Sequence, residues 1–106
     1  MQDCVFCKII KGELPSEKVF ESDNLIVIKD IHPQADTHVL IIPKVHVETT
    51  IGLNESTWSE IKMVSEKLIN EDGLKSFRIE TNGGSAAAVK HAHVHLLGEI
   101  SVDRKL

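Results

Sequence analysis

The chain has 106 residues, of which 42% are hydrophobic and 26% are charged, a composition that predicts one globular domain spanning residues 1–106. Its 16 acidic and 12 basic residues give a net charge of −4, which argues against nucleic-acid binding through phosphate contacts. No apolar run approaches the ~20 residues of a membrane span and no secretory signal is visible, so we expect a cytoplasmic protein with no membrane partner.

The first half of the chain predicts a short helix followed by three strands. A helical turn over residues 4–11 ends at Gly12. Two short apolar runs on either side of a Ser-Asp-Asn turn are typical of a β-hairpin. A continuous run of Val, Leu and Ile closed by Pro43 is typical of a buried central strand. The three strands are expected at residues 18–21, 25–28 and 39–42.

The second half predicts one long helix and two further strands. The helix follows Asn54, a favourable N-cap, and runs to about Asn70. Apolar residues alternate over residues 77–81, and after a glycine turn a second strand is expected over residues 91–96. A small antiparallel sheet with one main inserted helix is an α+β domain. Apolar residues at helical spacing are expected to pack on the core: Trp58, Ile61, Val64 and Leu68.

Histidines occupy every second position of the last expected strand, at His91, His93 and His95. Since successive side chains of a strand point to opposite faces, the three imidazoles would share one face, and Ala92 and Val94 would pack on the other. Imidazole titrates near neutral pH and serves as base, nucleophile or metal ligand, so this row is the candidate site. The alternatives are the polar face of an edge strand and a tag fragment, against which the internal position and the apolar neighbours argue.

The three histidines are too far apart for a single task. Residues two apart on a strand are separated by roughly 6.6 Å, and His91 and His95 by about 13 Å. Two imidazoles at that spacing can converge on one metal ion, but a third on the same straight strand does not easily reach it. One end of the row is therefore expected to serve a metal and the rest to serve chemistry.

A metal site is also indicated by the N-terminal Cys-x-x-Cys pair, whose spacing is common in zinc sites. Structural zinc takes four ligands, often two cysteines and two histidines. Spacing alone does not choose among the six histidines, and two reduced thiols on the N-terminal segment are the alternative. One set that completes four ligands is Cys4, Cys7, His46 and His91.

The turn Asn82-Gly83-Gly84 precedes the histidine strand. Glycines there let backbone N–H groups approach a phosphate group. Most Gly-Gly pairs are plain turns, but this one gains weight from the histidines beside it.

The chain resembles the histidine-triad nucleotide-binding proteins. His91-Ala-His-Val-His-Leu-Leu resembles the family signature, and residues 4–15 and 30–46 resemble its two upstream boxes, in the same order. The resemblance implies a five-stranded antiparallel sheet with one main helix and a short N-terminal helix, usually assembled as a homodimer. It also matches the zinc branch of the family at all four positions of the Cys/His set, and it implies a structural zinc ion.

The resemblance further implies binding of purine nucleotides and release of a nucleoside monophosphate, AMP or GMP, from phosphoramidates or related substrates. By position, His93 would form the nucleotidyl-histidine intermediate. His95 and His38 would contact the phosphate or the leaving group, and Asp30 would bind the ribose hydroxyls. The remaining matches are phosphate-side residues, Asn82, Gly83 and Gly84, and apolar base-pocket residues, Phe6, Ile9, Leu14 and Ile31.

The chain departs from the family pattern just before the triad, where Ala87 and Ala88 replace the usual Gln or Ser. A lost donor to a charged oxygen typically costs ~1.5–3 kcal/mol, so slower catalysis is expected. The sequence also ends eleven residues after His95, a short tail where relatives often set substrate choice. Two alternatives therefore stay open, a nucleotide-binding module with little catalysis and a zinc protein that binds no nucleotide.

Overall fold

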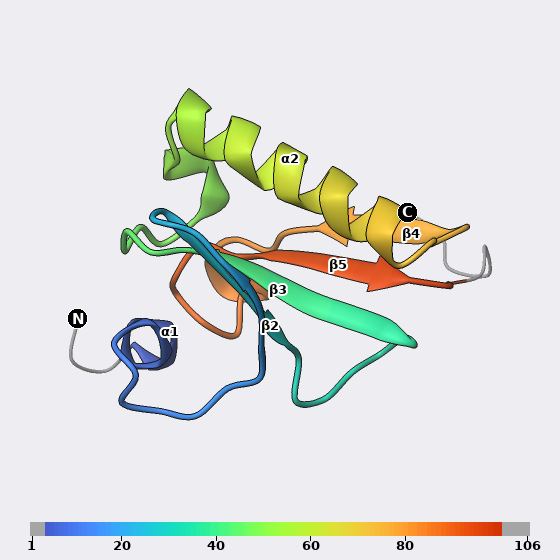
Figure 1. Ribbon diagram of the computed structural model, residues 1–106. Helices are drawn as coiled ribbons and strands as arrows, with labels where there is room; N and C mark the ends of the chain where they lie inside the picture. The colour runs from blue at the N-terminus through green and yellow to red at the C-terminus, as the bar shows by residue number, and fades with distance from the viewer. Residues whose placement is uncertain (1–3, 101–106) are drawn as a thin grey trace.

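The computed structural model describes residues 4–100, which form one five-stranded antiparallel sheet and two α-helices (Figure 1). The strand order β1-β2-β3-β5-β4 places β3 at the centre and leaves β1 and β4 at the edges. The predicted α+β fold, with one main helix and a short N-terminal helix, is confirmed. The elements are α1 (Val5–Ile10), β1 (Lys18–Glu21), β2 (Leu25–Lys29), β3 (Thr37–Pro43), a 3-10 turn at Thr50–Gly52, α2 (Glu55–Glu71), β4 (Phe77–Glu80), a 3-10 turn at Gly84–Ala86 and β5 (Val94–Gly98).

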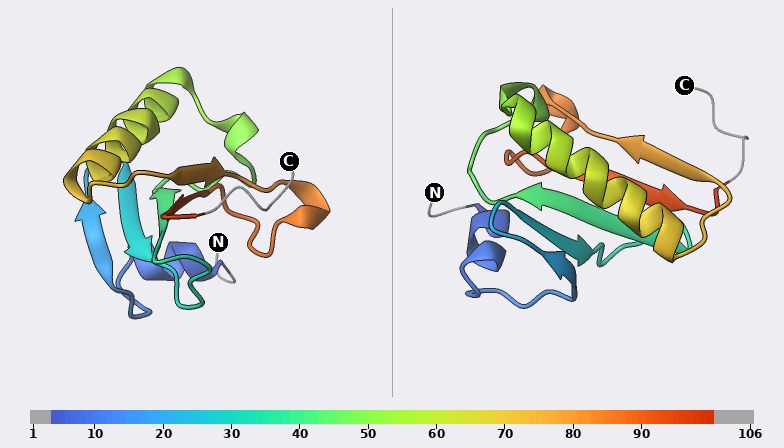
Figure 2. Two further views of the ribbon diagram at one scale, coloured as in Figure 1. Left: turned by 90° about the vertical axis from the view of Figure 1, so that its right-hand side faces the viewer. Right: turned by 45° about the horizontal axis from the view of Figure 1, so that its top comes forward.

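The sheet separates two apolar layers. Helix α2 covers one face and the short helix α1 lies against the other, as both views of Figure 2 show. On the α2 side, Ile41 and Leu96 are fully buried under Ile61 and Leu68 of the helix. On the α1 side, Phe6 packs with apolar residues of β2 and β3. None of the helices in residues 4–100 has both the length and the apolar character needed to cross a membrane.

Helix α2 begins where its sequence predicts, because Asn54 caps it. The Asn54 side chain accepts a hydrogen bond from the backbone N–H of Thr57 at 2.9 Å. The buried face of the helix is as expected for Ile61, Val64 and Leu68, but Trp58 is 38% exposed. The prediction that Trp58 belongs to the core is therefore wrong, since this residue lies in the first turn, where the helix leaves the packed layer.

Replacing Asn54 with Ala is expected to lower the free energy of unfolding by about 1 kcal/mol, because the N–H of Thr57 loses its acceptor. Denaturant unfolding of the two proteins measures the difference. The matched variant Asn54→Asp keeps an acceptor oxygen and should stay close to wild type. Equal stability of the Ala variant and wild type would show that the cap contributes nothing.

The histidine segment is a strand only in part, because β5 begins at Val94. The expectation that all three histidines lie in the strand is wrong. The first residue of β5, Val94, pairs with Ile41 of β3. Before it, the N–H of Ala92 donates to the carbonyl of Val47 at 2.7 Å instead of to β3. The predicted alternation nevertheless persists, since Ala92 and Val94 pack under α2 while the histidines face the other layer.

Candidate functional site

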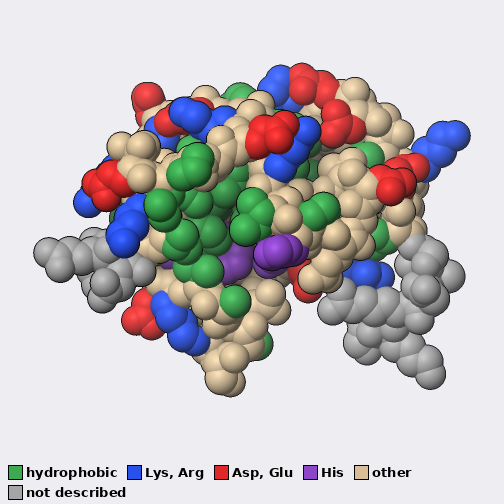
Figure 3. All heavy atoms as spheres, turned by 90° about the horizontal axis from the view of Figure 1, so that it is seen from below, with side chains coloured by type: hydrophobic (Ala, Val, Ile, Leu, Met, Phe, Trp, Pro, Cys, Tyr) green, Lys and Arg blue, Asp and Glu red, His purple; other side chains and the backbone are tan. Residues whose placement is uncertain are grey.

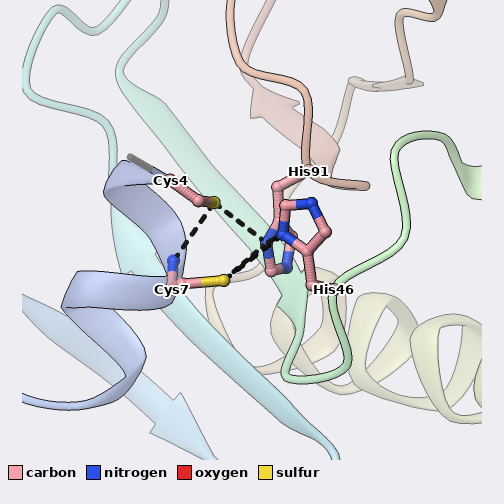
Figure 4. A group of neighbouring side chains, drawn as sticks. All are labelled: Cys4, Cys7, His46 and His91. Atoms are coloured by element: carbon pink, nitrogen blue, oxygen red, sulfur yellow. Dashed lines mark hydrogen bonds between the residues drawn. The ribbon is translucent and has the colours of Figure 1, made fainter. Parts of the chain in front are cut away.

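Two cysteines and two histidines from separate parts of the chain meet beside the sheet (Figure 4). Cys4 and Cys7 come from the start of α1, His46 from the segment after β3, and His91 from the segment before β5. The Sγ atom of Cys4 lies 3.3 Å from His91 Nδ1, and the Sγ atom of Cys7 lies 3.3 Å from His46 Nδ1. The structure thus brings together the four residues that the motif resemblance implies as zinc ligands.

The cluster fits a tetrahedral zinc ion. With Zn–S bonds of about 2.3 Å and Zn–N bonds of about 2.0–2.1 Å, neighbouring ligand atoms lie roughly 3.3–3.8 Å apart. The Nδ1 atoms of His46 and His91 are 3.1 Å apart, and Cys7 Sγ lies 3.6 Å from His91 Nδ1. The Nε2 atom of His91 lies 2.8 Å from the carbonyl oxygen of Pro43, which can only accept, so Nδ1 is the nitrogen left for a metal.

The surroundings of Cys7 and His91 favour the neutral forms of these two side chains. Burial raises the pKa of the Cys7 thiol, and the neighbouring Cys4 thiol raises it further. Burial also lowers the pKa of His91, which keeps its imidazole neutral, as metal ligation requires. A bound zinc ion would stabilise both thiolates. The donor set and the burial therefore suit zinc at this position.

The nucleophile candidate His93 is buried, with 6% of its surface exposed, and its ring packs edge-on against Phe6 at 5.0 Å between centroids. Its Nδ1 atom lies 2.7 Å from the backbone carbonyl of His91. Because a carbonyl oxygen only accepts, Nδ1 carries the proton and Nε2 has a free lone pair. This is the tautomer that a nucleophilic imidazole requires.

A second cluster joins His38, His95 and Asp30. The Nε2 atom of His38 lies 3.0 Å from His95 Nδ1 and 3.3 Å from a carboxylate oxygen of Asp30. The backbone N–H of Gln34 donates to Nδ1 of His38 at 3.1 Å. Neutral His38 therefore carries its proton on Nε2 and donates it to Nδ1 of His95, while the Asp30 carboxylate lies 3.3 Å from the same nitrogen.

This tautomer has two consequences. The Nε2 lone pair of His38 is not available to a metal, so the arrangement is a hydrogen-bonded chain, although its donor atoms are close enough to surround an ion. His95 accepts through Nδ1 and so carries its own proton on Nε2. Side by side, His93 then offers a lone pair and His95 offers a proton, with 5.1 Å between their ring centroids.

We expect His95 to titrate below its ordinary value near pH 6.5. Burial lowers the pKa of His95, and the nearby His93 and His38 lower it further. The unfolded chain binds a proton near pH 6.5 while the folded chain does not, so stability contributed by this group is present above about pH 6.5 and declines as the pH falls below it. NMR titration of the ring measures the midpoint.

The variant His95→Asn serves as the control for that titration, because it lacks the titrating group. Its free energy of unfolding should depend less steeply on pH below about pH 6.5 than that of wild type. A His95 midpoint at or above 6.5 would contradict the expectation.

A pocket of about 180 Å³ opens beside His95, on the sheet face opposite α2. Asp30 and His38 lie at one side of it, and Asn82 and Glu80 lie at the other. Figure 3 looks onto this face and shows histidine side chains at the surface beside hydrophobic ones. A larger cavity, about 390 Å³, opens at the C-terminal end of α2 and shares Asp30 and His38.

The residues predicted to form the apolar base pocket differ in how deeply they are buried. Phe6 is buried and Ile9 is partly buried in the same apolar cluster, whereas Leu14 is 37% and Ile31 84% exposed. Gly84 has a positive φ of 59°, which suits glycine, and its carbonyl accepts a hydrogen bond from Lys90.

At the two departures from the family pattern, Ala87 is buried and Ala88 is exposed. The alanine side chains themselves provide no hydrogen-bond donor.

Two residues at this site escaped the sequence analysis. Gln34 acts through its backbone N–H, which no side-chain motif reveals. Glu80 pairs directly with His95 in the β4–β5 register and lines the pocket. The alternation over residues 77–81 was a usable signal, because it puts Glu80 on the face of the strand opposite to that of Phe77 and Ile79.

Comparison with known proteins places these motifs in a wider group. A family model described as "Scavenger mRNA decapping enzyme C-term binding" matches residues 3–105. The chain is 38% identical over 101 residues to the adenylylsulfatase HINT3 of Arabidopsis thaliana, and the match covers 90% of this chain and 51% of that protein. The chain thus spans about half the length of this plant relative.

Solved structures agree over nearly the whole chain. A HIT family hydrolase from Clostridium thermocellum is 43% identical with a TM-score of 0.88, covering 100% of this chain and 98% of that one. A Zn-bound histidine triad family protein from Mycobacterium smegmatis is 28% identical with a TM-score of 0.84, covering 97% of this chain and 79% of that one.

Proposed function

Because this chain belongs to the histidine-triad (HIT) family, we propose that it is a purine nucleotide hydrolase or transferase that releases AMP or GMP from phosphoramidate-type substrates. The observation that carries this proposal is the pair of complementary imidazoles. His93 has a lone pair on Nε2 because its Nδ1 proton is held by a carbonyl, and His95 has a proton on Nε2.

In the proposed reaction, Nε2 of His93 attacks the α-phosphorus and forms a P–N bond to the enzyme. The bond from phosphorus to the leaving amine breaks, and this nitrogen takes up a proton from water while the Nε2–H of His95 would hydrogen-bond to the phosphate or the leaving group. The hydroxide left by that proton transfer then attacks the nucleotidyl-histidine, the phosphorus–nitrogen bond to His93 breaks, and the monophosphate is freed. Asp30 would orient the ribose through its carboxylate, while Asn82 would donate to the phosphate or the leaving group.

We propose a structural role for zinc at Cys4, Cys7, His46 and His91. With four protein ligands the ion has no open coordination position, so it would stabilise the fold rather than activate water. His91 would connect the ion to the reaction site, since its backbone carbonyl holds the ring of His93. The proposed location is the cytoplasm, where such thiols stay reduced.

We also propose a homodimer that pairs through the edge strand β4. Phe77 and Ile79 of this strand are 50% and 48% exposed, although the sequence places apolar residues there at strand spacing. An unpaired edge with exposed apolar side chains is a template for pairing with another strand. Sedimentation should give the mass of two chains for wild type and of one chain for Ile79→Lys; a wild-type monomer would refute this.

The experiment that tests the proposed function combines turnover with a covalent readout. The protein is mixed with adenosine 5′-phosphoramidate, AMP release is followed, and rapidly quenched samples are examined by mass spectrometry. We expect AMP release and a transient mass increase of one adenylyl group on a peptide containing His93. AMP release without any adenylylated peptide would refute the covalent route.

A second candidate function, a nucleotide-binding module with little catalysis, is favoured by Ala87 and Ala88. Without side-chain donors at these positions, stabilisation of the phosphate charge would fall to Asn82, His95 and backbone N–H groups. Calorimetry would then show AMP binding while the assay above shows no turnover.

A further inference from the structure

We propose that Glu80 selects the substrate by the charge of its leaving group, favouring a phosphoramidate whose amine carries a second, positively charged ammonium group. This inference rests on the proposed function and names its substrate class. The starting observation is that the Glu80 carboxylate lines the pocket but has no role in the proposed reaction.

The sheet register places Glu80 beside the reacting groups. In the antiparallel pair β4–β5, Glu80 is directly opposite His95, and such pairs have Cβ atoms about 4.5–5.5 Å apart on one face. His95 is in turn opposite Leu40 of β3, so it lies between β3 and β4. Glu80 is half-buried and lines the 180 Å³ pocket together with His95 and Asn82.

The order of groups across the sheet identifies which part of a substrate Glu80 would meet. Asp30 and His38 occupy the β3 side of the pocket, and the proposed function places the ribose at Asp30. The phosphorus would lie near His93 and His95, in the middle. The group on the far side of the phosphorus therefore extends toward β4, and Glu80 is the acidic residue on that side.

The charge of the pocket points in the same direction. Its described lining includes two carboxylates, Asp30 and Glu80, and neither Lys nor Arg. A sulfate or polyphosphate leaving group would bring further negative charge toward Glu80, whereas an ammonium group would be attracted to it.

The test compares three adenosine substrates that share the ribose and the α-phosphorus. Their leaving groups are 1,3-diaminopropane, which is cationic when bound through one nitrogen, n-propylamine, which is neutral, and sulfate, which is anionic. For wild type we expect kcat/KM to be about tenfold higher with the cationic amine than with the neutral one, and lowest with sulfate.

The variants identify Glu80 as the cause. Glu80→Gln should reduce the tenfold preference to near one and raise relative activity toward adenylylsulfate, and Glu80→Lys should reverse the preference. The control Glu66→Gln removes the same charge from an ion pair on the exposed surface of α2 and should keep the wild-type preference. The preference should also weaken at high salt. Thermal unfolding shows whether each variant is folded.

The outcomes separate this inference from the proposed function. If folded Glu80→Gln and Glu80→Lys keep the wild-type order of substrates while adenylylation persists, the assignment of Glu80 is wrong and the proposed function stands. If wild type turns over none of the three substrates, the proposed function is wrong and the inference falls with it.

Discussion

The His93→Ala variant is expected to release AMP from adenosine 5′-phosphoramidate at least about 100-fold more slowly than wild type. Among the described residues of the site, the variant loses the only imidazole whose Nδ1 proton is held by a backbone carbonyl and whose Nε2 atom therefore has a lone pair. The methyl side chain of alanine has no nitrogen that could bond to phosphorus, so the adenylylated form of the protein should no longer be detected. Steady-state rates and mass spectrometry measure the two effects.

Stability and metal content serve as controls for that loss. His93 is buried against Phe6, so its removal leaves a small cavity and lowers the melting temperature somewhat. The zinc ligands are untouched, and the variant should retain its metal. His93→Asn fills more of the space but lacks the nucleophile, and it should be equally slow. A folded His93→Ala protein that releases AMP at the wild-type rate would refute the proposed function.

Loss of the zinc ligands is expected to give the largest fall in stability. The double variant Cys4→Ser, Cys7→Ser removes both thiolates and should bind no zinc at equilibrium. Structural zinc contributes about 10–16 kcal/mol in zinc-finger peptides, which have almost no other core. This domain has apolar layers on both sides of its sheet, so we expect a smaller loss of at least about 3 kcal/mol. That corresponds to a fall in melting temperature of roughly 12–24 °C.

Elemental analysis and thermal unfolding check this expectation. Wild type purified without chelator should hold one zinc ion per chain, and a strong chelator should lower its melting temperature toward that of the double variant. His32→Ala removes an exposed histidine from a loop and should keep the full zinc content. Wild-type protein without zinc, or a double variant of unchanged stability, would contradict the proposed structural site.

The proposed zinc site and the proposed nucleophile are connected through one residue, His91. The ring of His91 supplies a nitrogen to the metal cluster, and its backbone carbonyl holds Nδ1 of His93. Removal of zinc should therefore slow adenylylation even at temperatures where the protein remains folded. Under the proposed function, this link would also explain why neighbouring histidines of the row have different roles.

Local patterns were sufficient for the elements whose sequence and packing agree. The Asn54 cap and the spacing of Ile61, Val64 and Leu68 correctly predict the start and the buried face of α2. These features depend on hydrogen bonds and side-chain directions within a few residues. The exposure of Trp58 did not follow from the same spacing, because the end of the packed layer is a property of the sheet beneath the helix.

The alternation of His91, His93 and His95 was readable in the sequence, and strand spacing also predicted that His91 and His95 would lie in separate clusters. Residue spacing did not identify the predicted zinc ligands, because any of the six histidines could complete the set. Only the motif resemblance selected His46. The late start of β5 was missed because the segment before it bonds to Val47, beyond the end of β3.

By itself, then, the sequence determined the order of helices and strands, the apolar faces and the identity of the chemical groups, all of which depend on neighbours along the chain. Only the tertiary structure decided the proton positions on His38 and His95, because the donor that sets them is the backbone N–H of Gln34. It alone placed Glu80 opposite His95. The physical reason is the same in both cases: hydrogen bonds and charges act through space, between residues that strand pairing brings together from distant parts of the chain.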